Sequence, residues 1–353
     1  MGRDGHGLDL TRYRHLHDCE RARAWLRIQQ NLGLAANTLH AYGRALNDFL
    51  EFLTRDAAQA ETASKENVAA WVRDLLRRPN TRSRKLVVID SGAGLANATL
   101  QQRITAVRLF FDYLIEEEVR SSNPVGRGRY TPRTRFATKG ERGILPRFRR
   151  LPWIPNDDEW RSVIEAAKAE PLRNRLMLAL SYDSALRREE LCGLATGDFD
   201  PANRTITVRA ETTKNRRSRV VPFSAATGEL LALYIRTRRG ISSSRGSLFL
   251  SESRRNRAAP VSIWTWSKAV KRISSRAGVE RFTTHTCRHL RLTDLARADW
   301  DIHEIAKFAG HKSVETTLLY IHLSGRDLAK KLASGMFQIH NWRIETLKEA
   351  LLE

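Results

Sequence analysis

The chain has 353 residues, enough for two domains with a sizeable core, and carries 61 Lys and Arg against 39 Asp and Glu, a net charge of +22. This excess predicts a polyanionic partner, and nucleic acid is favoured over a membrane surface because no apolar run approaches the ~20 residues of a spanning helix. The first ten residues lack a secretory segment, and three scattered cysteines support neither a disulfide framework nor a zinc site. We therefore expect a cytoplasmic protein with reduced thiols.

The first part of the chain is patterned as a small bundle of helices. Apolar residues recur at the spacing of one helix face in residues 39–53, 68–76 and 100–114. Asn37 is predicted to be the N-cap of the first of these helices, and the third is predicted to end at Ser122-Asn123-Pro124. With an earlier helix near residues 20–30, these segments predict a helical domain over residues 15–125. A polar, glycine-containing insertion at residues 79–97 has no assigned role.

Residues 126–152 are predicted to form a basic linker between domains. Residues 126–150 hold nine Lys or Arg against one acid, Glu141, and their prolines and four glycines break helices and strands. A solvated basic loop is one interpretation; we favour a segment that lies along a phosphate backbone through contacts that salt weakens. The residues assigned to DNA here are Arg127, Arg129, Arg133, Arg135 and Lys139.

After the linker, residues 153–335 are predicted to form a mainly α domain with a small antiparallel β-sheet. Helices are expected at residues 160–169 and 172–185. Residues 205–208 and 219–223 alternate as two strands joined by a polar turn that contains Lys214, and residues 247–250 are a candidate third strand. The tail, residues 336–353, is predicted to form an amphipathic helix.

Six polar side chains in this half have the chemistry for a metal-free attack on a phosphodiester. They are Arg187, Lys214, His285, Arg288, His311 and Tyr320. A phenolic oxygen can attack phosphorus, cations can stabilise the negative charge on the phosphoryl oxygens, and an ammonium can protonate the departing oxygen. Each residue alone also fits an ordinary structural role, such as a helix-end ion pair or an amphipathic tyrosine, so the interpretation depends on the set.

Local spacing predicts how these side chains are held. Arg187 is predicted to end an apolar helix, with Glu190 one turn further on to orient its guanidinium. His285 and Arg288 are three residues apart and share a helix face, from which His289 is expected to point away. Thr283 and Thr284 are expected to cap that helix.

The last two candidates lie on either side of a helix corner. Asp301 and Glu304 form a predicted capping box, and Gly310 is predicted to end their helix, which leaves His311 at the corner. Ser313 can cap the next helix, which carries Tyr320 nine residues after His311. The two side chains are therefore predicted to converge on one site.

In order and spacing, these stretches resemble the catalytic domain of the tyrosine recombinases, also called the phage integrase family. The matching segments are residues 186–191, the Lys214 hairpin ending in Arg219-Val220-Val221-Pro222, residues 285–289, and residues 310–313 followed by Tyr320. The helical part before the linker is similar to the family's core-binding domain, so the resemblance covers roughly residues 37–325. Two departures are Ala185, where glycine is usual, and Cys287, where leucine is usual, and neither removes a catalytic group.

The resemblance implies a two-domain, C-shaped clamp with a SAM-like core-binding domain and a catalytic domain. It implies that Tyr320 is the nucleophile, which forms a 3′-phosphotyrosyl intermediate, and that Lys214 is the general acid on the departing 5′ oxygen. His285 would act as acid/base near the tyrosine. The transition-state oxygens would be stabilised by Arg187, Arg288 and His311, with Glu190 in support. Arg217 and Arg219 of the hairpin join the expected DNA contacts.

The resemblance further implies a site-specific recombinase that exchanges strands of double-stranded DNA through a Holliday junction, as a homo-tetramer on paired sites and without metal or cofactor. Integration, excision or transposition of a mobile element is the expected role, with or without an accessory or second recombinase. A type IB topoisomerase and a non-catalytic DNA-binding member remain as alternatives. Against the latter, DNA binding alone does not require Tyr320.

Overall fold

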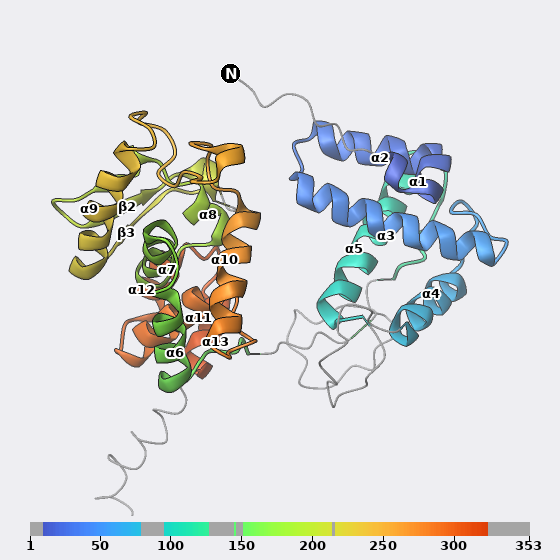
Figure 1. Cartoon of the computed structure of the whole chain (residues 1–353). Helices are drawn as coiled ribbons and strands as arrows, with labels where there is room; N and C mark the ends of the chain where they lie inside the picture. The colour runs from blue at the N-terminus through green and yellow to red at the C-terminus, as the bar shows by residue number, and fades with distance from the viewer. Residues whose placement is uncertain (1–9, 79–94, 127–144, 146–150, 214–215, 324–353) are drawn as a thin grey trace, which may run out of the picture. The chain divides into compact units, whose positions relative to one another are not determined.

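The computed structural model describes residues 10–78, 95–126, 145, 151–213 and 216–323, and the chain divides into two compact units, residues 1–149 and 150–353 (Figure 1). The described part is mainly helical with one small antiparallel sheet, so the predicted fold class is confirmed. Several predicted features lie outside the described residues, namely most of the 79–97 insertion, the linker residues Arg127, Arg129, Arg133, Arg135 and Lys139, Lys214, and the tail helix at 336–353.

Unit 1 is a helical bundle whose longest helices, α3 and α5, pack against each other. Its elements are η1 (Leu10–Arg12), α1 (Arg14–Asp18), α2 (Glu20–Asn31), α3 (Ala36–Arg55), α4 (Lys65–Arg77) and α5 (Asn97–Glu116). The apolar faces predicted from the sequence meet in an aromatic core, in which the Phe49 ring contacts Trp71 at 5.0 Å and Phe111 at 5.7 Å between centroids. The four predicted helices of this unit are confirmed.

Two predicted helix ends in unit 1 are wrong. The helix α3 begins at Ala36, after Ala35, so Asn37 already lies inside the first turn and does not cap it. The helix α5 ends at Glu116, well before Ser122-Asn123-Pro124, because Glu118 adopts a positive φ of 58° and the chain turns there. In the same unit Ser64 is the N-cap of α4: its hydroxyl accepts a hydrogen bond from the Asn67 backbone amide, and the Asn67 side chain accepts one from the Ser64 backbone amide.

A matched pair of substitutions tests this difference in capping. Ser64→Ala is expected to destabilise α4 by about 1 kcal/mol because a first-turn amide loses its acceptor. Asn37→Ala, also at an exposed position, is expected to change the stability of α3 by less than about 0.5 kcal/mol, since only the helix propensity of the residue changes. Hydrogen exchange of the α3 and α4 amides in the full chain measures both, and equal protection losses would contradict the assignment.

Unit 2 is mainly helical and contains a three-stranded antiparallel sheet of order β1-β2-β3. Figure 1 labels two of its strands, β2 and β3. Its strands are β1 (Phe199–Asp200), β2 (Thr205–Val208) and β3 (Arg219–Pro222). Its helices are α6 (Asp157–Ala167), α7 (Leu172–Asp183), α8 (Arg188–Cys192), α9 (Ala225–Arg239), α10 (Ile263–Arg276), α11 (Thr286–Arg297), α12 (Ile302–Ala309) and α13 (Glu315–Leu323), with short η2 (Thr196–Asp198), η3 (Ala210–Thr212) and η4 (Arg254–Asn256). The predicted β2–β3 hairpin is confirmed.

The prediction of a third strand at residues 247–250 is wrong, since β1 takes that place in the sheet. Residues 247–250 form only isolated bridges, with Ala195 and Pro260. The apolar run is buried, and its backbone bonds both to other backbone groups, at Leu194 and Val261, and to side chains. Arg238 donates to the carbonyls of Ser247 and Leu248 at 2.7 and 2.9 Å, positions that a neighbouring strand would otherwise occupy.

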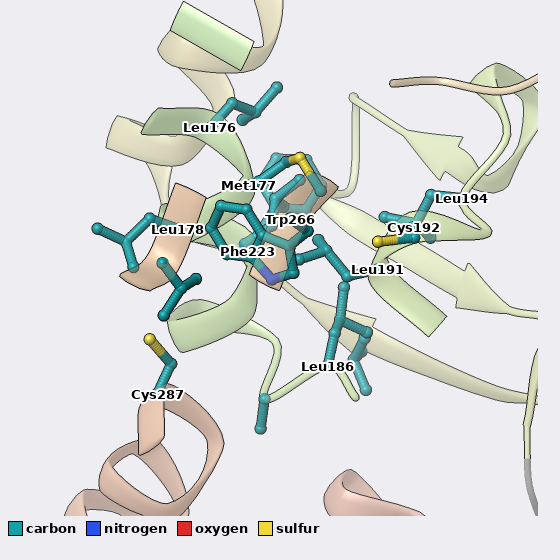
Figure 2. Close-up of a cluster of buried hydrophobic side chains, with 14 of the residues drawn as sticks. Leu176, Met177, Leu178, Leu186, Leu191, Cys192, Leu194, Phe223, Trp266 and Cys287 are labelled. Atoms are coloured by element: carbon teal, nitrogen blue, oxygen red, sulfur yellow. The ribbon is translucent and has the colours of Figure 1, made fainter. Parts of the chain in front are cut away.

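The core of unit 2 fixes the segment that carries Arg187. Leu186 and Leu191, on either side of it, are buried in one cluster with side chains of α7 and with Trp266 of α10 (Figure 2). The three cysteines of the chain are free thiols. Within the described ranges, no helix has the length and apolar character that crossing a membrane requires.

Candidate active site

The carboxyl end of α12 gathers three arginines that lie far apart in the sequence. Three consecutive carbonyl groups there each accept a hydrogen bond from a different guanidinium: Phe308 from Arg219 at 3.0 Å, Ala309 from Arg288 at 2.6 Å, and Gly310 from Arg187 at 3.2 Å. The last carbonyls of a helix lack partners within the helix and carry partial negative charge. This helix end therefore brings three positive charges together beside His311.

The corner at Gly310 lets the chain leave the helix without covering these carbonyls. Gly310 has the left-handed φ of 62°, and the amides of Gly310 and His311 bond back to Lys307 and Ala306. The predicted capping box of Asp301 and Glu304 and the helix end at Gly310 are confirmed. A Cβ on Gly310 would lie 3.0 Å from the Arg219 guanidinium, so only glycine fits both the φ and the space.

Glu190 balances part of this charge from inside the protein. Its carboxylate, 1% exposed, accepts from Arg219 at 2.7 and 3.0 Å and from Arg187 at 2.8 Å. Burial alone would raise the pKa of Glu190, but the hydrogen bonds from Arg219 and Arg187 lower that pKa to about 2. The contact predicted between Arg187 and Glu190 is thus present, and Glu190 stays ionised.

Arg187 does not end α7, as the sequence analysis expected; it precedes α8 as its N-cap. The reason is the backbone at Ala185, whose positive φ of 46° stops α7 at Asp183. The carbonyl of Ala185 then accepts from Arg288 at 2.5 Å. Ala185 therefore adopts a left-handed conformation that glycine adopts more easily. This conformation is the reason why glycine is usual at this position in the family.

Tyr320 lies on α13 against α11 and is 3% exposed. Its hydroxyl hydrogen-bonds to Nδ1 of His289 at 3.0 Å. Its ring is nearly parallel to that of His311, at 9° and 6.0 Å between centroids, and Nδ1 of His311 lies 2.9 Å from the Thr317 hydroxyl. Burial raises the pKa of Tyr320, and the positive charges of Arg288 and Arg187 oppose that rise.

The prediction that His289 points away from the site is wrong. The helix α13 packs across α11, so the residue directly after Arg288 faces the tyrosine. His285 is instead the exposed N-cap residue of α11, with its ring 6.5 Å from that of His289. Thr283 and Thr284 do not cap this helix; the Thr283 hydroxyl bonds to that of Thr286 at 3.1 Å.

Charge in the site comes from the arginines rather than the histidines. Burial, then Arg288, lowers the pKa of His311 to about 3, and burial, then His285, lowers that of His289 to about 4. Both rings are therefore neutral at neutral pH. Burial and the charge of Arg187 lower the pKa of Arg288 to about 9, which still leaves the guanidinium charged.

The structure brings Arg187, Arg288, His311 and Tyr320 together with Glu190, and places His285 at the exposed edge. Arg217 is exposed, whereas the side chain of Arg219 is 8% exposed and is bound to Glu190. Strand alternation carried a signal for this, because Arg219 lies on the same face of β3 as the buried Val221. Within the described residues, no group of three or more His, Cys, Asp or Glu side chains is arranged to hold a metal ion.

Known proteins resemble this chain along most of its length. Residues 156–326 match the model of the phage integrase family, and residues 23–118 match that of the phage integrase N-terminal SAM-like domain. A tyrosine recombinase of Thermosipho africanus is 28% identical over 303 residues, which are 84% of this chain and 93% of the relative. Tyrosine recombinase XerC of Actinobacillus pleuropneumoniae is 26% identical over 83% of this chain and 93% of its own length.

Solved structures with the same fold include XerH bound to palindromic difH substrate, with a TM-score of 0.65, 20% identity, and coverage of 91% of this chain and 86% of that one. The Tn1549 transposon integrase in complex with a circular intermediate DNA gives a TM-score of 0.62 at 15% identity, covering 84% and 93%. The chain belongs to the tyrosine recombinase (phage integrase) family, and it is an enzyme that breaks and rejoins DNA.

The buried carboxylate makes a prediction about stability in acid. Because the folded-state pKa of Glu190 lies below its ordinary 4.5, its contribution to the free energy of unfolding is fully present above pH 4.5 and is lost as the pH falls toward about 2. That contribution is about 3 kcal/mol. Glu190→Gln should be less stable than the natural chain at pH 7, and the difference should shrink between pH 4.5 and 2.

Urea unfolding of both proteins at a series of pH values measures this difference. Glu229→Gln, which removes an exposed carboxylate from α9, is the control for loss of a surface charge. A stability difference that stays constant down to pH 2 would contradict the ion pairs assigned to Glu190.

Proposed function

We propose that the chain is a site-specific recombinase that cleaves double-stranded DNA with Tyr320, holds the strand as a 3′-phosphotyrosyl ester and rejoins it through a Holliday junction. The supporting observation is the placement of Arg187, Arg288 and His311 around the tyrosine, at the end of α12. The proposal includes a homo-tetramer on paired sites, a cytoplasmic location, and a role in integration, excision or transposition of a mobile element. It requires no metal or cofactor.

The arginines are suited to hold a phosphate because their planes are already fixed. A guanidinium has five N–H donors. Arg187 directs Nη1 to Glu190 and Nη2 to Gly310, and Arg288 directs its two terminal nitrogens to Ala185 and Ala309. The remaining donors can bind phosphoryl oxygens without reorganising, and each such donor is typically worth about 3 kcal/mol in the transition state.

The remaining parts of the reaction are assigned by the family pattern. Lys214, which lies in the sequence between β2 and β3, is proposed to protonate the departing 5′ oxygen. His285 at the exposed edge is proposed as a general acid/base near Tyr320, and His311 at the corner is proposed to stabilise the phosphoryl oxygens. Since the phosphotyrosyl ester preserves the energy of the phosphodiester, rejoining requires no nucleotide.

Binding to DNA is proposed for two parts of the chain, a core-binding domain at residues 15–125 and a catalytic domain at residues 153–335, with the linker at 126–152 between them in the sequence. Arg127, Arg129, Arg133, Arg135 and Lys139 of the linker are proposed to neutralise phosphates. Structural neighbours solved with DNA, among them the XerH and Tn1549 integrase complexes, support a DNA partner. The recombinase names of the relatives favour recombination over a topoisomerase or a non-catalytic DNA binder.

Tyr320→Phe tests the nucleophile. The phenylalanine keeps the ring that packs beside His311 and removes only the attacking oxygen, so we expect cleavage to be abolished while DNA affinity changes less than about twofold. The assay incubates the protein, without metal or nucleotide, with nicked suicide duplexes tiled from the DNA flanking its gene, and detects an adduct that survives boiling in detergent. An undiminished adduct in Tyr320→Phe would exclude Tyr320 as the nucleophile.

Arg217 and Arg219 form a matched pair that separates DNA contact from internal support. Arg217 is exposed, so Arg217→Gln should weaken binding to all duplexes and reduce the slope of log affinity against log salt by about 1. Arg219 is engaged by Glu190 and Phe308, so Arg219→Gln should leave that slope unchanged and instead lower stability and cleavage. Titrations of DNA binding at several salt concentrations measure this slope. A reduced slope for Arg219→Gln would show that Arg219 contacts DNA, as predicted from the sequence.

A further inference from the structure

We propose that His289 is a further catalytic residue, whose Nδ1 takes the phenolic proton of Tyr320 as the tyrosine oxygen attacks phosphorus. This inference rests on the proposed function, which makes Tyr320 the nucleophile. It assigns to His289 the proton transfer that the family pattern alone would give to His285.

The first argument is the surroundings of the hydroxyl. Tyr320 is 3% exposed, so bulk water has little access to its side chain. The hydroxyl lies 3.0 Å from Nδ1 of His289, within the range of a hydrogen bond along which a proton can transfer. With Nδ1 as the acceptor, the ring of His289 carries its own proton on Nε2.

The second argument is that the two other histidines are less well placed for this transfer. His285 is exposed at the start of α11, and its ring centroid lies 6.5 Å from that of His289. The tyrosine hydroxyl is hydrogen-bonded to His289 and not to His285. His311 presents the face of its ring to the phenol, since the two rings are within 9° of parallel, and its Nδ1 is engaged with Thr317. Their positions suit contact with a phosphate or transfer of a proton outward from His289.

The third argument is the charge around His289. The groups that face it are His285 and Arg288 on α11, His311 at the corner and Tyr320 on α13, while Tyr182, from the packed helix α7, is bonded to Asp294. Burial, His285 and Arg288 keep the pKa of His289 low, at about 4, so in the free protein the ring is neutral and only weakly basic. A DNA phosphate bound to Arg288 would offset the positive charge and make His289 more basic, which would couple activation of the tyrosine to the arrival of substrate.

The step balances without any further reactant. The O–H bond of Tyr320 breaks and its proton moves to Nδ1 of His289, while the tyrosine oxygen forms a bond to phosphorus. The bond from phosphorus to the 5′ oxygen breaks, and that oxygen takes a proton from Lys214. Rejoining runs these transfers in reverse, with His289 returning the proton to the phenolic oxygen.

The test measures single-turnover cleavage of a nicked suicide duplex from pH 6 to 9 by the natural chain, His289→Gln, His289→Ala and His285→Gln. Glutamine keeps a hydrogen-bond acceptor near the phenol but is not basic. We expect His289→Gln to cleave about 100-fold more slowly at pH 7, with a deficit that shrinks about tenfold per pH unit as hydroxide replaces the lost base. His285→Gln should keep the pH dependence of the natural chain.

Several outcomes separate this inference from a purely positioning role and from the proposed function itself. If His289→Gln cleaves at the natural rate and pH dependence while His289→Ala is slow, His289 only positions the tyrosine and the inference is overturned. A steep pH dependence in His285→Gln alone would move the proton transfer to His285. No Tyr320-dependent adduct from the natural chain would overturn the proposed function and this inference together.

A second substrate separates loss of the base that activates Tyr320 from loss of the acid that protonates the departing oxygen. A duplex with sulfur in place of the bridging 5′ oxygen has a leaving group that needs no proton, so it should restore cleavage by Lys214→Ala but not by His289→Gln. Equal recovery of both variants would contradict the role of His289. Circular dichroism and DNA affinity equal to those of the natural chain confirm that each variant is folded.

Discussion

The site depends on the meeting of three guanidinium groups with the carboxyl end of α12. A helix end offers carbonyl oxygens that need donors, and arginines gathered in one place need acceptors and negative charge. Both needs are met here, because three arginines, Arg187, Arg219 and Arg288, donate to three consecutive carbonyl groups of this helix end. Glu190 supplies the buried negative charge. Because each arginine comes from a different part of unit 2, this contact joins β3, the start of α8 and α11 to one helix end.

This arrangement separates the tasks of charge and proton transfer. The arginines hold fixed positions in the site, whereas burial, together with the nearby positive charges, lowers the pKa of His289 and of His311 and keeps both rings neutral. Neutral imidazoles beside a buried phenol can accept a proton, and permanent cations beside them can bind a phosphate. The residues nearest to Tyr320 thus have the two properties that attack on a phosphodiester requires.

Much of the fold followed from local pattern. The helices of unit 1, the β2–β3 hairpin and the capping box of Asp301 were predicted because periodicity and capping act within a few residues. The third strand was misplaced because an apolar run of this length is common to strands and buried loops, and its isolated bridges and the bonds from Arg238 are tertiary contacts. The prediction that Asn37 caps α3 was wrong because the helix can begin as readily at the adjacent residue, Ala36.

The sequence by itself determined which chemical groups are present, in an order and spacing that identified the family and named Arg187, Arg288, His311 and Tyr320. Only the tertiary structure decided which histidine meets the tyrosine and which partners hold the guanidinium of Arg219. Helical spacing determines which residues share a face of a helix. Which face lines the site depends on the helix that packs against it, and here α13 packs against the face of α11 that carries His289. That packing depends on contacts between residues distant in sequence, which no local pattern encodes.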